Sequence, residues 1–155
     1  MTLLLKVLQL LLFLLDFIQA NTVTIKNSGG QAINVGFFKN LGDNQPSFVA
    51  ERNIRVDGRG GSQTIAPGRK WEGRVQKITG APADPATWVE FHFNAWQDMT
   101  FGDVSLICGY NGAVRLTSKD GNLNRGFSQN LYSHAPQKYK IRDSNGKPVL
   151  AATET

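Results

Sequence analysis

The residues of this 155-residue chain most suited to chemistry are two carboxylates, Glu90 and Asp103, in successive extended segments. Two carboxyl groups that share one face can divide acid–base work on a glycosidic bond, at separations of about 5 Å or up to roughly 9.5 Å according to mechanism. We expect such a pair if neighbouring strands direct both side chains to the same face. Otherwise Glu90 is a solvent-facing strand residue, and Asp103 caps a turn after residues 101–102.

Aromatic side chains add candidate platforms for a sugar ring, because carbohydrate sites combine aromatic faces with polar groups. For each of them the alternative is that the side chain packs in the core, since large aromatic side chains mostly fill protein interiors. Two of them, Trp96 and Tyr110, fall in predicted turns, and we expect these two to be exposed. The full set is Trp71, Trp88, Trp96, Tyr110 and Tyr132.

The sequence offers little for metal binding or for a nucleophilic triad. His92 and His134 have neither a third ligand nor a partnered nucleophile in view, and a single cysteine cannot form a CxxC motif. We therefore expect no metal and no cofactor. The glycine-rich stretch at 57–62 is followed by neither Lys-Ser/Thr nor a helix start, so we interpret it as a turn rather than a phosphate-binding loop.

Extended segments must position these residues. Alternation of apolar and polar residues predicts an opening hairpin from 22–26 and 32–38, and an Asn-Gly pair predicts a closing hairpin between 138–142 and 148–150. No helix of substantial length is indicated. Further strands are expected at 48–56, 64–65, 70–75, 88–93, 103–107 and 113–117. This spacing favours an all-β fold, a single-domain antiparallel β-sandwich.

Composition agrees with one β-rich domain. With 41% hydrophobic residues, 16 Gly and nine Phe, the chain is too aromatic for disorder and too rich in glycine for a helical bundle. The formal net charge of +5 favours anionic partners such as cell-wall polymers or lipid headgroups, so membrane binding stays open. The Lys and Arg residues are scattered, which argues against nucleic acid. We expect a monomer.

Residues 1–20 have the layout of a secretory signal peptide, with basic Lys6, a leucine-rich run and small Ala20 at the expected cleavage point. Two polar residues interrupt the run, which argues against the alternative of an uncleaved anchor. We therefore expect a secreted, extracellular protein whose mature domain spans residues 21–155.

The single cysteine, Cys108, cannot form an internal disulfide, so packing must hold the fold together. It ends an apolar strand pattern at 104–108, which is typical of a small buried side chain. A disulfide between two chains and a nucleophilic thiol are the alternatives.

One region resembles a known family. Residues 88–111, WVEFHFNAWQDMTFGDVSLICGYN, are similar to the thaumatin-like pattern in which T-L-A-E-F is followed by D-F-Y-D-V-S-L-V-D-G-F-N, with the same spacing from the Glu to the first Asp of the cleft. Upstream, IAPGRKW at 65–71 resembles the family's L-x-P-G-Q-S-W strand entry, and TVTIKN at 22–27 resembles its opening strand. The three matches follow the family's order.

This resemblance implies a secreted β-sandwich whose cleft binds β-1,3-glucan or, in some members, hydrolyses it slowly. Glu90 takes the place of the family's Glu and Asp103 that of its first cleft Asp, whereas Cys108 stands where the next Asp is expected. The family's Arg falls near Lys77 or Ile78, and the family's many cysteines are missing here. The candidate ligand-binding set is Glu90, Asp103, Trp96, Tyr110 and Lys77, with Glu90 and Asp103 also the candidate catalytic pair.

Three functions stay open at this point. The favoured one is a thaumatin-like protein that binds cell-wall polysaccharide of the β-1,3-glucan type, in defence, competition or host interaction. The second is a weak endo-β-1,3-glucanase, a glycoside hydrolase that uses Glu90 and Asp103. The third is a secreted effector or membrane-active toxin that shares only the fold. Binding is favoured over catalysis because Cys108 replaces one of the family's acids.

Overall fold

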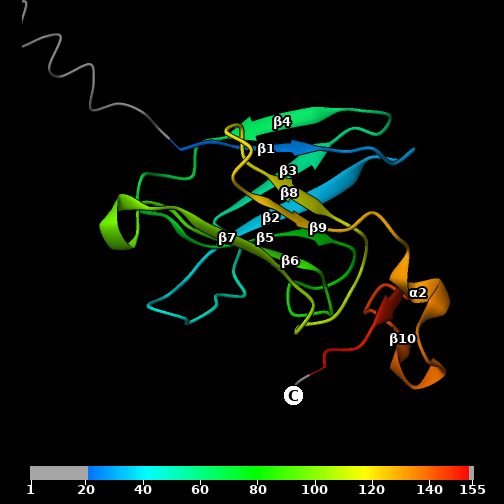
Figure 1. The fold of residues 1–155 in the computed structure, drawn as a ribbon. Helices are drawn as coiled ribbons and strands as arrows, with labels where there is room; N and C mark the ends of the chain where they lie inside the picture. The colour runs from blue at the N-terminus through cyan, green and yellow to red at the C-terminus, as the bar shows by residue number, and fades with distance from the viewer. Residues whose placement is uncertain (1–20, 154–155) are drawn as a thin grey trace, which may run out of the picture.

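A five-stranded antiparallel sheet is the larger layer of the fold, as Figure 1 shows. The computed structural model describes residues 21–153, so the signal peptide expected at 1–20 lies outside the described residues. The fold of the described chain is all-β and sandwich-like, as the sequence predicts. In pairing order the strands are β3 (Arg52–Val56), β2 (Ile33–Lys39), β5 (Glu72–Ile78), β6 (Trp88–His92) and β7 (Phe101–Ser105).

Shorter elements complete the fold. Three two-stranded antiparallel sheets are formed by β1 (Val23–Lys26) with β4 (Ser62–Ile65), by β8 (Arg115–Thr117) with β9 (Asn124–Gly126), and by β10 (Lys140–Arg142) with β11 (Pro148–Leu150). The helical elements are single turns: η1 (Trp96–Asp98), α2 (Leu131–His134) and η2 (Gln137–Tyr139). No helix within residues 21–153 has the length and apolar character needed to cross a membrane.

The hydrophobic core lies on one face of the five-stranded sheet. Side chains alternate between the faces of a strand, so Val35 and Phe37 on β2 and Val75 on β5 point to the same side. Strands β1 and β4 contribute to the core from outside this sheet, and each fully buried apolar side chain contributes about 1.5–3 kcal/mol. The cluster consists of Val23, Val35, Phe37, Val56, Ile65, Trp71, Val75, Phe91 and Phe93.

The two predicted hairpins have different outcomes. The closing hairpin is confirmed: β10 pairs with β11 across the connection at 143–147, in which Gly146 of the Asn-Gly pair has a positive φ of 74°. The opening hairpin is wrong, because β1 pairs with β4 and β2 pairs with β3 and β5. Residues 27–30 do connect the two strands, but they carry the chain from one sheet to another rather than back along the same strand.

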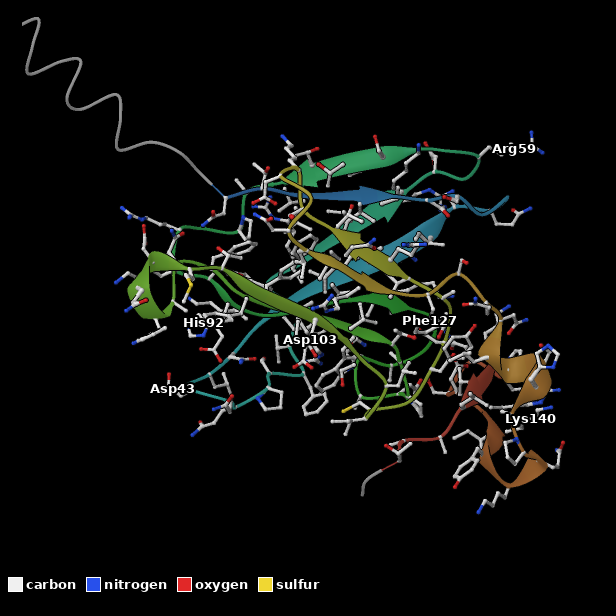
Figure 2. The ribbon with its side chains drawn as sticks, in the orientation of Figure 1. Asp43, Arg59, His92, Asp103, Phe127 and Lys140 are labelled. Atoms are coloured by element: carbon white, nitrogen blue, oxygen red, sulfur yellow. The ribbon has the colours of Figure 1, made fainter. Side chains whose placement is uncertain are left out.

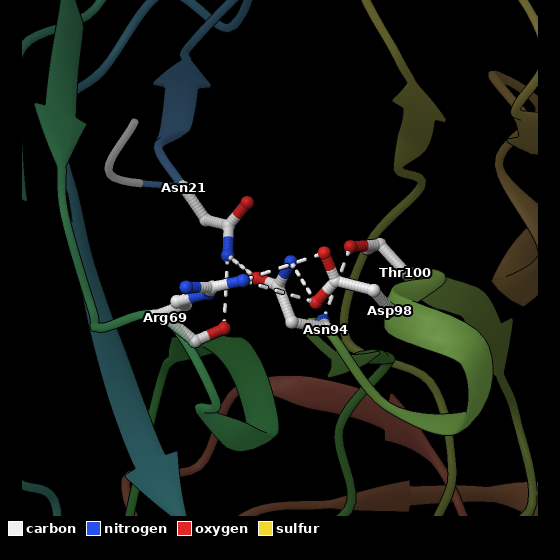
Figure 3. Close-up of polar contacts among 5 residues, drawn as sticks. All are labelled: Asn21, Arg69, Asn94, Asp98 and Thr100. Atoms are coloured by element: carbon white, nitrogen blue, oxygen red, sulfur yellow. Dashed lines mark hydrogen bonds and ion pairs between the residues drawn. The ribbon is translucent and has the colours of Figure 1, made fainter. Parts of the chain in front are cut away.

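The turn between β6 and β7 has a strained backbone and is held by side-chain hydrogen bonds. Asn94, Gln97 and Asp98 all have positive φ, of 46°, 52° and 61°, a region that side chains other than glycine adopt only at a cost. Figure 3 shows how the turn is held: Asn94 donates to the Asp98 carboxylate at 3.0 Å and accepts from Asn21, and Arg69 lies 3.4 Å from Asp98. The turn therefore presents exposed Trp96 from a constrained backbone.

Replacing Gln97 by glycine should stabilise the protein. Gln97 is exposed, and its side chain makes no hydrogen bond to any residue in the 21–153 range that the structure describes, so the change removes backbone strain without removing a contact. We expect the free energy of unfolding to rise by about 0.5–1 kcal/mol in urea denaturation. Gln97→Ala keeps the strained φ and should give no such gain; equal stabilisation by both variants would contradict the explanation.

Candidate functional site

The two candidate carboxylates face each other across paired strands. In the antiparallel ladder Glu90 of β6 is directly opposite Asp103 of β7, and on its other side it is directly opposite Arg74 of β5. Directly opposed residues point to the same face, with Cβ atoms about 4.5–5.5 Å apart. Asp103 is thus a strand residue and does not cap a turn, and the three charged side chains form one row on the face opposite the core.

Glu90 and Asp103 of this row line a cavity of about 390 Å³, which we name the acidic pocket. The loop that carries Asn40, Asn44 and Pro46 closes one side of it. Figure 2 labels Asp43 of this loop on the same side of the molecule as His92 and Asp103. The main lining side chains from the sheet are Glu72, Trp88, Glu90, His92, Phe101, Asp103 and Ser105.

Burial raises the pKa of the Glu90 carboxyl above its usual range. The negative charge of Asp103 raises this pKa further, whereas the positive charge of Arg74 and a hydrogen bond from Ser105 lower it. Asp103 is exposed. The pocket therefore holds the half-buried Glu90 carboxyl, which keeps its proton to a higher pH than usual, beside the exposed Asp103. A third acid, half-buried Glu72, also lines the pocket and lies 3.9 Å from His92.

Arg74 is the functional residue that sequence reasoning missed. Its side chain is 1% exposed, and its guanidinium carbon lies 3.9 Å from the centre of the Trp88 ring, 4.3 Å from that of Phe38 and 5.0 Å from that of Phe48. It donates from Nε to Gln76 at 2.7 Å and from Nη1 to a backbone carbonyl of the 40–51 loop. Burial lowers its pKa to about 10, so the side chain stays charged at neutral pH.

The predicted ligand-binding residues do not all meet at the acidic pocket. Lys77 and Tyr110 instead line a second cavity, and Tyr110 is 6% exposed, so the expectation of an exposed Tyr110 is wrong. Its ring stacks on Phe127 and its hydroxyl bonds to Asn130, which explains the burial. The expectation for Trp96 is confirmed, since this side chain is 68% exposed.

The other aromatic candidates divide between core and pocket. Trp71 is buried in the core and donates from Nε1 to Glu51 at 2.9 Å. Trp88 is 7% exposed but lines the acidic pocket, while Tyr132 is half-buried beside the second cavity. Of these three residues, only Trp71 is explained by core packing alone.

Cys108 lies at the acidic pocket and not inside a strand. Strand β7 ends at Ser105, three residues earlier, and Cys108 is half-buried and lines the pocket wall. The prediction of a buried strand residue is wrong, because the chain turns away after Ser105. The negative form of its thiol raises the pKa of Arg74.

Within residues 21–153, no group of three or more His, Cys, Asp or Glu side chains is arranged to hold a metal ion. The pocket and the sheet that carries it define the chain as an all-β, sandwich-like protein with an acidic pocket on the face opposite its core. No protein-family pattern matches the chain, and no curated protein sequence matches it.

Replacing Asp103 by asparagine should lower the pKa of Glu90, because it removes the neighbouring negative charge. Ionisation of a carboxyl with a raised folded-state pKa opposes folding, so the stability that Glu90 contributes is present below its unfolded-state pKa and is lost as pH rises through its folded-state pKa. Asp103→Asn should therefore reduce this loss. Carboxyl ¹³C NMR titration measures the pKa directly.

Asp57→Asn provides the matched control, because Asp57 is exposed in the β3–β4 turn and pairs with Arg55 rather than with Glu90. An unchanged Glu90 titration in Asp103→Asn would contradict the electrostatic coupling of the pair.

Proposed function

We propose that this chain is a secreted, thaumatin-like protein that binds cell-wall polysaccharide of the β-1,3-glucan type in its acidic pocket, in defence, competition or host interaction. The observation that carries the proposal is the register of Glu90 opposite Asp103, with both side chains in one open pocket. The resemblance of residues 88–111 to the family supplies the ligand class. The sequence pattern of residues 1–20 supplies the proposal of secretion.

The chemistry of the pocket suits a neutral, hydroxyl-rich ligand. The carboxylates accept hydrogen bonds from sugar hydroxyls, and Ser105 and His92 can both donate and accept. Phe101 is 49% exposed at the rim and offers an apolar face to a sugar ring. Arg74, directly opposite Glu90 in the same row, supplies a buried positive charge that limits the repulsion between the two acids.

A polymer extends beyond a pocket of this size, and exposed Trp96 offers a further stacking surface on the adjoining turn. The turn is already constrained by its hydrogen bonds, so stacking there costs little additional ordering. Trp96 does not line the pocket itself, and its contribution would therefore grow with the length of the glucan.

Binding is tested by a pull-down on insoluble β-1,3-glucan, with chitin and cellulose as comparison polymers. We expect retention on the glucan and about tenfold weaker binding for Asp103→Asn, because an exposed charged acceptor is lost. Asp57→Asn makes the same chemical change at a residue that does not line the pocket, and this variant should bind like the unmodified protein. Retention on none of the polymers would count against the proposal.

Weak hydrolysis of the same polymer is the second candidate function, favoured by the raised pKa of Glu90. A carboxyl that keeps its proton can act as the general acid, and Asp103 on the neighbouring strand would then be the nucleophile or base. Directly opposed strand positions bring the two Cβ atoms to about 4.5–5.5 Å, which favours the shorter carboxyl separation of glycosidases that retain configuration.

This second function predicts slow release of reducing sugar from soluble β-1,3-glucan, and its loss by at least about a hundredfold in Glu90→Gln. The glutamine keeps the size of the side chain but has no proton to transfer. Reducing-sugar release that survives in Glu90→Gln would rule out Glu90 as the acid, whatever the result of the pull-down.

A further inference from the structure

A second cavity, of about 520 Å³, lies where the ends of β2 and β5 meet the C-terminal segment. We name it the basic pocket. Figure 2 labels Phe127, which stacks on Tyr110 of this cavity, and Lys140 on one side of the molecule, and His92 and Asp103 of the acidic pocket apart from them. Its main polar lining side chains are Lys77, Thr79, Tyr110, Asn130, Tyr132 and Lys147.

The ammonium of Lys77 is the central feature of the basic pocket. The side chain is half-buried, and desolvation lowers its pKa. Its Nζ lies over Gly112, 2.8 Å from the position that a Cβ would occupy there. Within the part of the chain that the structure describes, this ammonium has neither a hydrogen-bond acceptor nor an ion-pair partner. A partly desolvated cation of this kind gains from an anion that completes its shell.

The walls of the basic pocket are fixed by hydrogen bonds. Asn111 donates to the backbone carbonyl of Lys77 at 2.8 Å and accepts from Thr87 N at 3.2 Å. Asn130 accepts from Tyr132 N at 3.0 Å and from the Tyr110 hydroxyl at 3.4 Å. These bonds join the end of β5 to α2, so the cavity is preformed and a ligand need not pay to assemble it.

The charged side chains that line the basic pocket are both positive. Lys147 lines the cavity together with Lys77, and no carboxylate lines it among the residues that the structure describes. Asp143, on the turn just before Lys147, is buried and accepts backbone N–H groups from Asn145 and Lys147. Both bonds go to Oδ1 and leave Oδ2 buried without one within residues 21–153, but this carboxylate does not line the cavity. Lys77 and Lys147 are therefore the charged side chains that a ligand meets there.

We propose that the basic pocket binds a charged sugar, a hexose unit that carries a carboxylate or a phosphate. Lys77 and Lys147 contact the anionic group, and the amide of Asn130, Thr79 and the ring of Tyr132 contact the hydroxyls and the apolar face of the ring. The volume lies within the range of small-ligand sites and matches one or two sugar units. This site goes beyond the proposed glucan binding and shares no lining residue with the acidic pocket.

The test is calorimetric titration of the protein with sodium galacturonate, its uncharged methyl ester and glucose 6-phosphate. We expect at least one anion to bind, and the ester to bind at least about tenfold more weakly than galacturonate if the carboxylate is recognised. Binding of galacturonate alone identifies a carboxylated sugar, and binding of the phosphate alone identifies a phosphorylated one. Lack of binding by both anions overturns the proposal.

Variants locate the site. Lys77→Gln and Lys147→Gln should each weaken binding of the anion about tenfold, whereas Lys119→Gln removes the same charge from the exposed β8–β9 turn and should have no effect. Lys147 is exposed, so Lys147→Gln tests the site even if substitution of the half-buried Lys77 prevents folding. The dispersion of the NMR signals shows whether each variant is folded. The proposal is overturned if Lys119→Gln weakens binding of the anion equally. It is also overturned if neither Lys147→Gln nor a folded Lys77→Gln weakens that binding.

Glucan pull-down depends on Glu90 and Asp103 in the other pocket. Loss of anion binding with intact glucan binding, or the reverse, therefore separates a failure of this inference from a failure of the proposed function.

Discussion

Burial of the Arg74 guanidinium organises the face of the sheet that lies opposite the core. A charged group withdrawn from water is costly unless its surroundings replace the lost solvation. Here Phe38 and Trp88 from the sheet and Phe48 from the 40–51 loop surround the cation, and the loop also supplies the carbonyl of Ser47. The interactions that solvate Arg74 therefore also hold this loop against the sheet, and the same loop closes one side of the acidic pocket.

The same cation links the architecture to the electrostatics of the site. Arg74 lowers the pKa of Glu90 while burial and Asp103 raise it, and Glu90 in turn raises the pKa of Arg74. Each group thus reduces the cost of keeping the other charged. The pocket can hold two acids side by side because a buried positive charge sits in the next strand, directly opposite Glu90.

The fold class and the nearness of the two acids were predictable from the sequence, because both depend on period-two alternation in contiguous segments. The alternation at 88–93 and 103–107 places Glu90 and Asp103 in adjacent strands, and a short connection makes those strands neighbours. The position of Arg74 was not predictable, since β5 pairs with β6 across a nine-residue connection at 79–87 and its register follows from packing rather than from a turn. For the same reason the pairing of β1 with the distant β4 was missed.

The alternation of side chains along β5 decides which pocket each of its two cations lies beside. Arg74 and Lys77 lie three residues apart on β5, an odd separation, so their side chains point to opposite faces of the sheet. Arg74 consequently lies among the aromatic rings beside Glu90, and Lys77 reaches the cavity formed with the C-terminal segment. A slip of one residue in the β5–β6 register would exchange these faces and leave Glu90 and Asp103 without the buried cation. The apolar residue between them that lies in the core, Val75, opposes that slip, because the same shift would take its side chain out of the core. Hydrophobic packing on one face of β5 thus fixes the placement of charge on both.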